Sequence, residues 1–309
     1  MLDPEIAALI GTPAPLPSLT GETIAALRAD MKVIGAQLPS VELADIRDLD
    51  AEGIPVRLYR PSNETNLPLL IFLHGGGWFL GDLETHDSMH RHLAALSGCA
   101  VMAVEYRLAP EHPFPAGLDD ALAAFEWARR EAAALGCDPQ RIALGGESAG
   151  ANLAAATTLR LRRNGAGQPL FQLLVHPVTD LSFSLPSIST VEVPGLTPEY
   201  LKQCRKLYVG DADPGDPLIS PLKADTHAGL APAIVLTASE DPLRDDGEYY
   251  APALARDGVE TLACRLPSLP HGFMFMPIDL PAVDRSYRAM ARLIRRYFAA
   301  DSEHPNVAS

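Results

Sequence analysis

The chain has 309 residues, enough for one large α/β domain with a substantial core and a small additional segment. Its 25 basic and 39 acidic residues give a net charge of −14 without a basic run, which argues against nucleic acid and anionic membrane surfaces as partners. No apolar run approaches the roughly 18 residues of a membrane span. The N-terminus lacks the pattern of a secretory signal. The scattered cysteines predict free thiols, and therefore a protein of the cytoplasm: Cys99, Cys137, Cys204 and Cys264.

Residues 1 to about 40 are predicted to form two helices separated by a proline-rich segment at 12–17. The second helix begins after Thr20, a good N-cap residue. Its apolar residues recur at helical spacing: Ile24, Leu27, Met31 and Ile34. Such a helix either packs on the domain or lies across a pocket as a lid, and the sequence leaves both interpretations open.

The next part of the chain alternates short apolar runs with helical patterns. Residues 41–60 predict an antiparallel hairpin, and helices are expected at 118–135 and 283–298. Strands that are apolar throughout suit a parallel sheet covered on both faces. We therefore predict a doubly wound, mostly parallel α/β sheet with strands at 67–73, 100–104, 142–144, 173–175, 234–237 and 261–266.

A proline-rich interval of about fifty residues, from Asp180 to Leu230, interrupts this alternation. It contains one predicted helix, with Thr197 as the N-cap and Pro198 in the first turn. An insertion of this length after a strand is usually functional or disordered. Because it has a helix and aromatic residues, we expect it to be ordered and to form part of a cap.

The segment Gly146-Glu147-Ser148-Ala149-Gly150 lies between a predicted strand and a predicted helix. The pattern G-x-S-x-G in this setting is a nucleophile elbow, a tight turn that presents the serine above the sheet. The flanking glycines relieve crowding in such a turn. Ser148 is therefore the candidate nucleophile.

A second glycine-rich segment, His74-Gly75-Gly76-Gly77-Trp78, follows the predicted strand at 67–73. Acyl transfer requires N–H donors for the oxyanion that forms in the tetrahedral intermediate. We expect the backbone N–H groups of Gly75, Gly76 and Ala149 to form this oxyanion hole. The alternative is an ordinary glycine-rich turn.

A serine nucleophile also requires a base and a group that orients the base. In α/β enzymes with a nucleophile elbow, the three residues occur along the chain in the order serine, acid, histidine. Asp241 follows the predicted strand at 234–237, and His271 follows the strand at 261–266, so both are expected at the edge where Ser148 lies. The alternative acids are Asp180, after an earlier strand, and the neighbours Glu240, Asp245 and Asp246, of which the last two are expected to begin a helix.

A cluster of histidines, His86, His90 and His92, includes two at the spacing of helix-borne metal ligands. No HExxH or carboxylate-rich motif accompanies them, so a solvated or supporting role is expected. We predict no metal.

With these motifs assembled, the chain resembles the bacterial hormone-sensitive-lipase-like (family IV) carboxylesterases of the α/β-hydrolase superfamily. The resemblance rests on the HGGGW segment, residues 106–116, the elbow, residues 241–245 and residues 271–273. It implies an α/β-hydrolase fold with a helical cap, hydrolysis of small carboxylic esters with short to medium acyl chains, and no cofactor. The implied cap comprises residues 1–45 and 181–225, and the catalytic domain comprises residues 46–180 and 226–309.

Two residues differ from the elbow sequence Gly-Asp-Ser-Ala-Gly-Gly that is common in this family. Glu147 replaces the aspartate and Ala151 the last glycine. Neither belongs to the triad, so the departures bear on substrate preference and on the contacts around the elbow. Amides, peptides and lactones remain alternative substrates, a non-catalytic ligand-binding protein is an alternative function, and a homodimer is left open.

Overall fold

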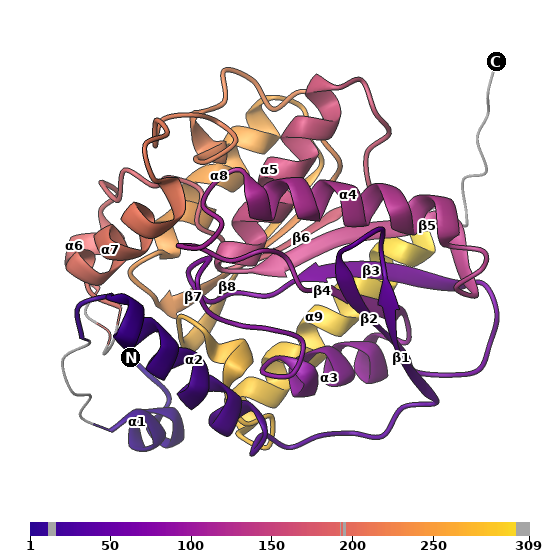
Figure 1. Ribbon diagram of the computed structural model, residues 1–309, viewed down its shortest axis with the longest axis horizontal. Coiled ribbons are helices and arrows are strands. Elements are labelled where there is room, and N and C mark those ends of the chain that lie inside the picture. Colours follow the sequence, from indigo (N-terminus) through magenta and orange to yellow (C-terminus); the bar gives the residue numbers. More distant parts are fainter. Residues whose placement is uncertain (12–16, 192, 194–195, 301–309) are drawn as a thin grey trace.

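Eight strands form one sheet in the computed structural model, which describes residues 1–11, 17–191, 193 and 196–300 (Figure 1). The strand order is β1-β2-β4-β3-β5-β6-β7-β8. β1 and β2 form the predicted antiparallel hairpin, β2 is antiparallel to β4, and all later neighbours are parallel. The strands are β1 (Asp45–Asp50), β2 (Pro55–Arg60), β3 (Leu67–Leu73), β4 (Ala100–Val104), β5 (Cys137–Glu147), β6 (Gln172–Val175), β7 (Ala233–Glu240) and β8 (Thr261–Pro270).

The central strands are apolar throughout because each contributes to two cores. In β3, the side chains of Leu69, Ile71 and Leu73 belong to one buried cluster, and those of Leu70 and Phe72 belong to another on the opposite face. Successive side chains of a strand point to opposite faces, so a strand covered on both sides cannot alternate with polar residues. The predicted doubly wound sheet is confirmed.

Helices cover both faces of the sheet (Figure 1). α4 (Ala116–Glu131), α5 (Ala149–Arg163) and α8 (Arg244–Arg256) contribute to one buried cluster, and α3 (Asp87–Ser97) and α9 (Pro281–Ala300) contribute to the other. No helix among the described residues is both long enough and apolar enough to cross a membrane.

Two helices precede the sheet, α1 (Pro4–Ile10) and α2 (Gly21–Gly35). Thr20 caps α2 as predicted, and its hydroxyl accepts the Thr23 N–H. The predicted apolar stripe of α2 is shorter than expected, because Ile24 is buried whereas Ile34 is 49% exposed. The predicted linker at 12–16 and the tail after residue 300 lie outside the described residues.

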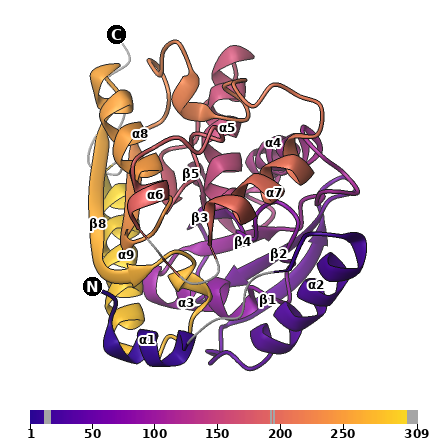
Figure 2. The ribbon, with the colours of Figure 1, turned by 90° about the vertical axis from the view of Figure 1, so that its left-hand side faces the viewer.

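The insertion between β6 and β7 contains α6 (Ser187–Thr190), α7 (Pro198–Val209) and the short 3₁₀ helix η1 (Pro221–Lys223). Thr197 caps α7 as predicted, accepting the Tyr200 N–H. α7 lies beside α2, where Ile24 and Cys204 share a small buried cluster with Phe79 (Figure 2). The two irregular parts of the chain therefore meet on one side of the molecule. A second 3₁₀ helix, η2 (Phe273–Phe275), follows β8.

Candidate active site

The predicted site residues converge because they follow neighbouring parallel strands. Ser148 follows β5, Asp241 follows β7 and His271 follows β8. The carboxyl ends of parallel strands meet at one edge of a sheet, which is where open α/β sheets bind their ligands. Residues separated by 123 positions in the sequence, Ser148 and His271, are in direct contact there.

Ser148 occupies the tight turn between β5 and α5. Its φ is +53°, a conformation that a non-glycine residue rarely adopts. The neighbouring glycines have no room for a side chain, because a Cβ on Gly150 would overlap the carbonyl oxygen of Leu73 and a Cβ on Gly146 would overlap Gly150. The turn therefore requires both glycines.

Ser148, His271 and Asp241 form a continuous chain of hydrogen bonds. Ser148 Oγ lies 2.7 Å from His271 Nε2, and His271 Nδ1 lies 2.8 Å from Asp241 Oδ2. The other oxygen of Asp241, Oδ1, accepts the Leu243 N–H at 2.7 Å. Because a carboxylate can only accept, Nδ1 carries the proton and Nε2 is left as the acceptor for the serine hydroxyl. Burial alone would lower the pKa of His271, but the charge and hydrogen bond of Asp241 raise it.

The alternative acids have other partners. Asp180 pairs with Lys223 Nζ at 2.8 Å. Asp245 accepts the Ser187 N–H, and Asp246 accepts the N–H groups of Thr179 and Asp180. Both lie at the start of α8, as predicted. Of the candidate acids, Asp241 is the one hydrogen-bonded to His271.

The predicted oxyanion donor Gly75 requires correction. Its N–H donates to Glu147 Oε1 at 2.7 Å, so it is not free for a substrate. Gly76 and Gly77 line the cavity beside Ser148 instead. Among the described residues, the N–H groups of Gly76, Gly77 and Ala149 have no hydrogen-bond acceptor.

The histidine cluster is divided among different surroundings. His86 Nε2 lies 3.7 Å from Glu147 Oε1, His90 is buried against the rings of Tyr59 and Phe72, and His92 contacts Ser88. Among the described residues, no group of three or more His, Cys, Asp or Glu side chains is arranged to hold a metal ion.

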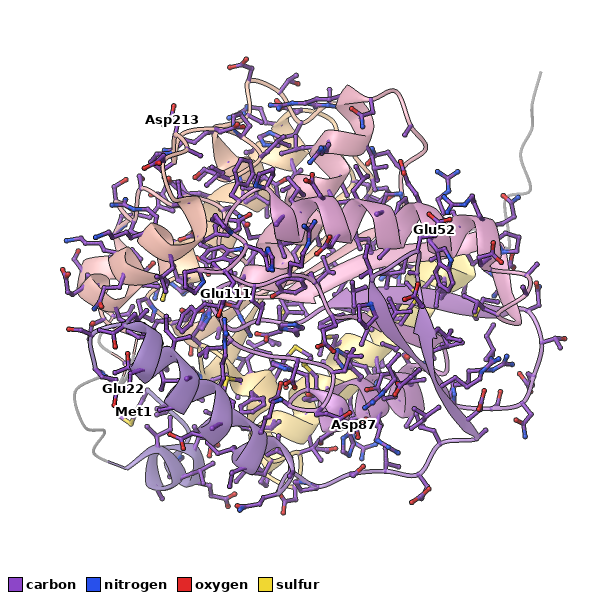
Figure 3. The ribbon with its side chains drawn as sticks, viewed as in Figure 1. Met1, Glu22, Glu52, Asp87, Glu111 and Asp213 are labelled. Atoms are coloured by element: carbon purple, nitrogen blue, oxygen red, sulfur yellow. The ribbon has the colours of Figure 1, made fainter. Side chains whose placement is uncertain are left out.

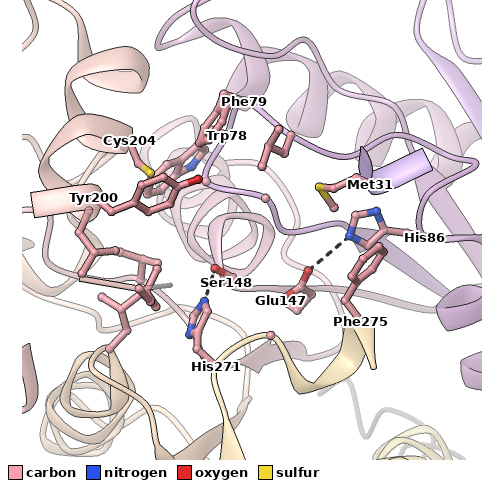
Figure 4. Close-up of a pocket in the computed structure, with 18 of the residues that line it drawn as sticks. Met31, Trp78, Phe79, His86, Glu147, Ser148, Tyr200, Cys204, His271 and Phe275 are labelled. Atoms are coloured by element: carbon pink, nitrogen blue, oxygen red, sulfur yellow. Dashed lines mark hydrogen bonds and ion pairs between the residues drawn. The ribbon is translucent and has the colours of Figure 1, made fainter. Parts of the chain in front are cut away.

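A cavity of about 270 Å³ opens beside Ser148 and His271 (Figure 4). Its walls are mainly apolar and include the aromatic rings of Trp78, Phe79 and Phe275. The parts of the wall far from the triad come from α2 and from the insertion: Met31, Phe183, Leu196, Tyr200, Leu201 and Cys204. Ser148, His271 and the apolar cavity therefore form one site.

Comparison with known proteins identifies the family. A model of the alpha/beta hydrolase fold matches residues 70–275. The carboxylesterase NlhH of Mycobacterium tuberculosis is 38% identical, with 96% of this chain and 97% of that protein covered. The ethyl acetate hydrolase of Pseudomonas putida is 40% identical over 80% of each chain. An esterase structure from Pyrobaculum calidifontis superposes with a TM-score of 0.85 at 35% identity, covering 96% of this chain and 99% of that one.

The chain belongs to the bacterial hormone-sensitive-lipase-like carboxylesterases. It is an enzyme that hydrolyses carboxylic esters, and the predicted fold and reaction class are confirmed. The non-catalytic alternative is thereby set aside.

Sequence reasoning missed two residues of this carboxylesterase site. His176, at the end of β6, packs against His271 with ring centroids 4.4 Å apart. It follows a predicted strand just as Asp241 and His271 do, so the same argument could have found it. Gly77 was passed over for Gly75, because nothing in the sequence indicates that the Glu147 carboxylate reaches the Gly75 N–H.

Proposed function

We propose that Ser148, His271 and Asp241 are the catalytic triad of this carboxylesterase. The observation that carries the proposal is the hydrogen-bond chain from Ser148 Oγ through both ring nitrogens of His271 to Asp241, with distances of 2.7 and 2.8 Å. These distances are those expected of a nucleophile, its base and the group that orients the base.

In the first half-reaction, Ser148 Oγ attacks the ester carbonyl carbon while its proton passes to His271 Nε2. Asp241 stabilises the resulting imidazolium. The tetrahedral intermediate collapses, the C–O bond to the alcohol breaks, and the alcohol leaves with the proton from His271. Water then attacks the acyl-enzyme with His271 again as the base, releasing the carboxylic acid and restoring Ser148.

The oxyanion of each tetrahedral intermediate is stabilised by the N–H groups of Gly76, Gly77 and Ala149. Ala149 is the first residue of α5, so its N–H has no acceptor within the helix and lies at the positive end of the helix dipole. Gly76 and Gly77 have φ values of +109° and +60°, which favour glycine at both positions.

Residues 1–45 and 181–225 act as the cap over this site, and residues 46–180 and 226–309 act as the catalytic domain. The support is that both cap segments contribute to the cavity wall, through Met31 and through Tyr200, Leu201 and Cys204. A wall of this kind limits the length of chain that fits. Each added acyl methylene that is buried should stabilise the transition state by up to about 0.8 kcal/mol and so increase kcat/KM. We expect kcat/KM to decline beyond about four to eight acyl carbons.

The cellular location and the oligomeric state are two further parts of this proposal. Three of the four cysteines are buried and none is in a disulfide, which supports a cytoplasmic location. Within the part of the chain that the structure describes, β8 pairs with β7 alone, and its residues Ala263, Cys264 and Arg265 are exposed. Such an open edge is suited to antiparallel pairing with β8 of a second copy, and we propose that it forms the homodimer interface.

The decisive test is Ser148→Ala assayed with p-nitrophenyl esters of graded acyl length beside matching amides. We expect kcat to fall by about 10⁴- to 10⁶-fold, without a change in the melting temperature. A fluorophosphonate probe is expected to label Ser148 in the wild-type protein. Near-normal turnover by the pure variant, or an adduct on another residue, would remove Ser148 from the mechanism. Higher turnover of amides than of esters would shift the proposed substrate.

A further inference from the structure

A buried carboxylate beside the nucleophile has no part in the triad. Glu147 precedes Ser148, and its side chain is 6% exposed. Its carboxylate touches three other parts of the chain: Oε1 accepts the Gly75 N–H at 2.7 Å and lies 3.7 Å from His86 Nε2, and Oε2 lies 3.4 Å from His176 Nε2. Figure 4 shows Glu147 beside Ser148, with its carboxylate turned towards His86.

This carboxylate is ionised. Burial alone would raise the pKa of Glu147, but the contacts with His86 and His176 and the charge of His271 lower it to about 2. The other titratable groups under its influence include His74, His90, Tyr106 and Tyr287. A full negative charge is therefore held within the core at the carboxyl end of β5.

His176 lies between this charge and the proposed catalytic base. It is fully buried, and its φ of +33° is unusual for a residue other than glycine. Its ring packs against His271 with centroids 4.4 Å apart and planes at 56°, and against Phe273 at 5.3 Å. Neither of its ring nitrogens makes a hydrogen bond within the described chain. The polar atom near the ring is Glu147 Oε2, which lies 3.4 Å from His176 Nε2.

The His176 ring is neutral at neutral pH. Burial and the charge of His271 lower the pKa of His176 to about 4, although Glu147 and Asp241 oppose them. A neutral imidazole with one ring nitrogen close to a carboxylate is polarised by that charge and becomes more electron-rich, as in the carboxylate–histidine pairs of metal sites. Such a ring attracts a neighbouring cation. During the proposed reaction, the neighbouring cation is the imidazolium of His271.

We propose that Glu147 and His176 are positioning residues for His271, holding its ring towards Ser148 and stabilising its protonated form in addition to Asp241. The inference rests on the proposed role of His271 as the base. The charged or titratable groups that face His271 are then Asp241 and Asp246 from the β7–α8 region, Glu147 from β5 and His176 from β6.

The length of Glu147 explains how one side chain serves this role and also fixes the glycine-rich loop. The carboxylate spans from the end of β5 to the Gly75 N–H after β3, and a Cβ on Gly75 would overlap it. Glutamine has the same length and retains an acceptor for Gly75, but it carries no charge. Aspartate retains the charge but is one methylene shorter. The two substitutions therefore separate the charge from the reach.

The experiment measures kcat, KM and the pH dependence of kcat/KM for Glu147→Gln, Glu147→Asp, His176→Phe and the double variant, by pH-stat titration of a soluble short-chain ester. The acid limb is the part of the pH profile in which kcat/KM rises with pH, and its midpoint reports the pKa of the base. For E147Q, this midpoint should fall by about half to one pH unit, because a lost negative charge lowers the pKa of the base. Its kcat should fall about tenfold. E147D should lose kcat while its acid limb stays within about 0.2 units of wild type.

His176→Phe keeps an aromatic wall but breaks the link between Glu147 and His271. We expect it to lower the acid limb as E147Q does, and adding E147Q to it should produce little further shift. An unmoved acid limb in E147Q with a wild-type melting temperature would overturn the proposal. A shift that is undiminished in the H176F background would remove His176 from it, and H176F alone provides the pH profile if E147Q fails to fold.

Failure of this inference is distinguishable from failure of the proposed triad. If the triad is wrong, Ser148→Ala stays active whatever the pH profile of the Glu147 variants. If only the inference is wrong, Ser148→Ala is inactive and the acid limb of E147Q does not move.

Discussion

Asp241 and Asp245 are four residues apart but have different partners. Asp241 accepts a hydrogen bond from His271 Nδ1–H, whereas Asp245 accepts one from the Ser187 N–H and pairs with Arg244. We expect Asp241→Asn to lower kcat by about 10⁴-fold, because asparagine favours the wrong tautomer and provides no charge for the imidazolium. Steady-state kinetics on a short-chain ester provide the measurement.

Asp245→Asn is the matched control, since it makes the same chemical change four residues later, in the first turn of α8. It should retain most of the activity and lose some stability. A larger loss of kcat in Asp245→Asn or Asp180→Asn than in Asp241→Asn would assign the orienting acid elsewhere.

Asp246 is a buried acid that stays protonated at neutral pH. Its Oδ1 accepts the N–H groups of Thr179 and Asp180 at 2.7 and 2.8 Å, and its Oδ2 has no hydrogen-bond partner in the described chain. Burial raises the pKa of Asp246 from 3.8 to about 8. As pH rises through this interval, the unfolded chain loses the proton and the folded chain keeps it, so the stability contributed by this group is lost.

Asp246→Asn removes this ionisation while keeping an oxygen for both N–H groups. Relative to wild type, its melting temperature should therefore rise between pH 5 and pH 8, by about 4 °C or more. Thermal unfolding followed by circular dichroism at both pH values tests this. Asp180→Asn is the control: burial opposes, but Lys223 and Ser182 lower the pKa of Asp180, so this carboxyl is ionised in both the folded and the unfolded chain at pH 5 and at pH 8, and the difference between D180N and wild type should stay constant. A constant difference between D246N and wild type would contradict the prediction.

The individual site residues differ in how well the sequence predicts them. That Ser148, Asp241 and His271 meet could be predicted, because strand ends and chain order constrain their positions. The choice between Gly75 and Gly77 could not, because it depends on a contact between Gly75 and a side chain 72 residues later. Contacts between buried polar side chains, such as Glu147 with His176, leave no periodic signal.

At the level of secondary structure, the side chain of Arg28 attaches α2 to the active-site loops. Arg28 Nε donates to the Phe79 carbonyl at 2.8 Å and Nη2 to the Ala109 carbonyl at 2.9 Å, and the guanidinium pairs with both oxygens of Glu111, which is labelled in Figure 3. Because Phe79 lines the cavity, this attachment holds one wall in place.

Arg28→Ala should broaden the dependence of kcat/KM on acyl length and shift its optimum to longer chains, with a loss of several-fold on short esters. The pH profile should not change, since the triad is untouched. p-Nitrophenyl esters of graded length provide the assay. Lys32→Ala is the control on the same helix: Lys32 pairs with Asp82 but is 61% exposed, so its loss should have little effect. An unchanged acyl-length profile in R28A would mean that α2 packs without limiting the cavity.

The elements themselves are predicted to different degrees. All six apolar runs are strands, and the Thr197 cap begins a helix, because these signals are local. α3 was not identified, since His86, His90 and His92 obscure its apolar positions Met89 and Leu93. Ile34 shares the helical spacing of the apolar stripe of α2 but is 49% exposed, whereas the next residue, Gly35, packs against the backbone of Thr85.

For the whole molecule, the open edge of β8 determines how two copies can associate. Antiparallel pairing about the centre of residues 261–266 would bring Cys264 of each copy close together. Cys264 is exposed and the other three cysteines are buried. We expect light scattering to detect a dimer and mild oxidation to cross-link it through Cys264.

Cys264→Ser should remain dimeric and resist cross-linking. A monomer at all concentrations would exclude the dimer. A dimer of the wild-type protein that does not cross-link would locate the interface on another surface.

The strand order has a consequence for the protein during its synthesis. Ser148, the proposed nucleophile, follows β5, but His271, the proposed base, follows β8, which is the last strand in the sequence and an edge strand of the sheet. A growing chain on the ribosome can therefore fold its serine turn long before it can activate that serine. Hydrolysis begins only when nearly the whole chain has emerged, so incomplete copies released early carry an inert hydroxyl in place of an unregulated hydrolase.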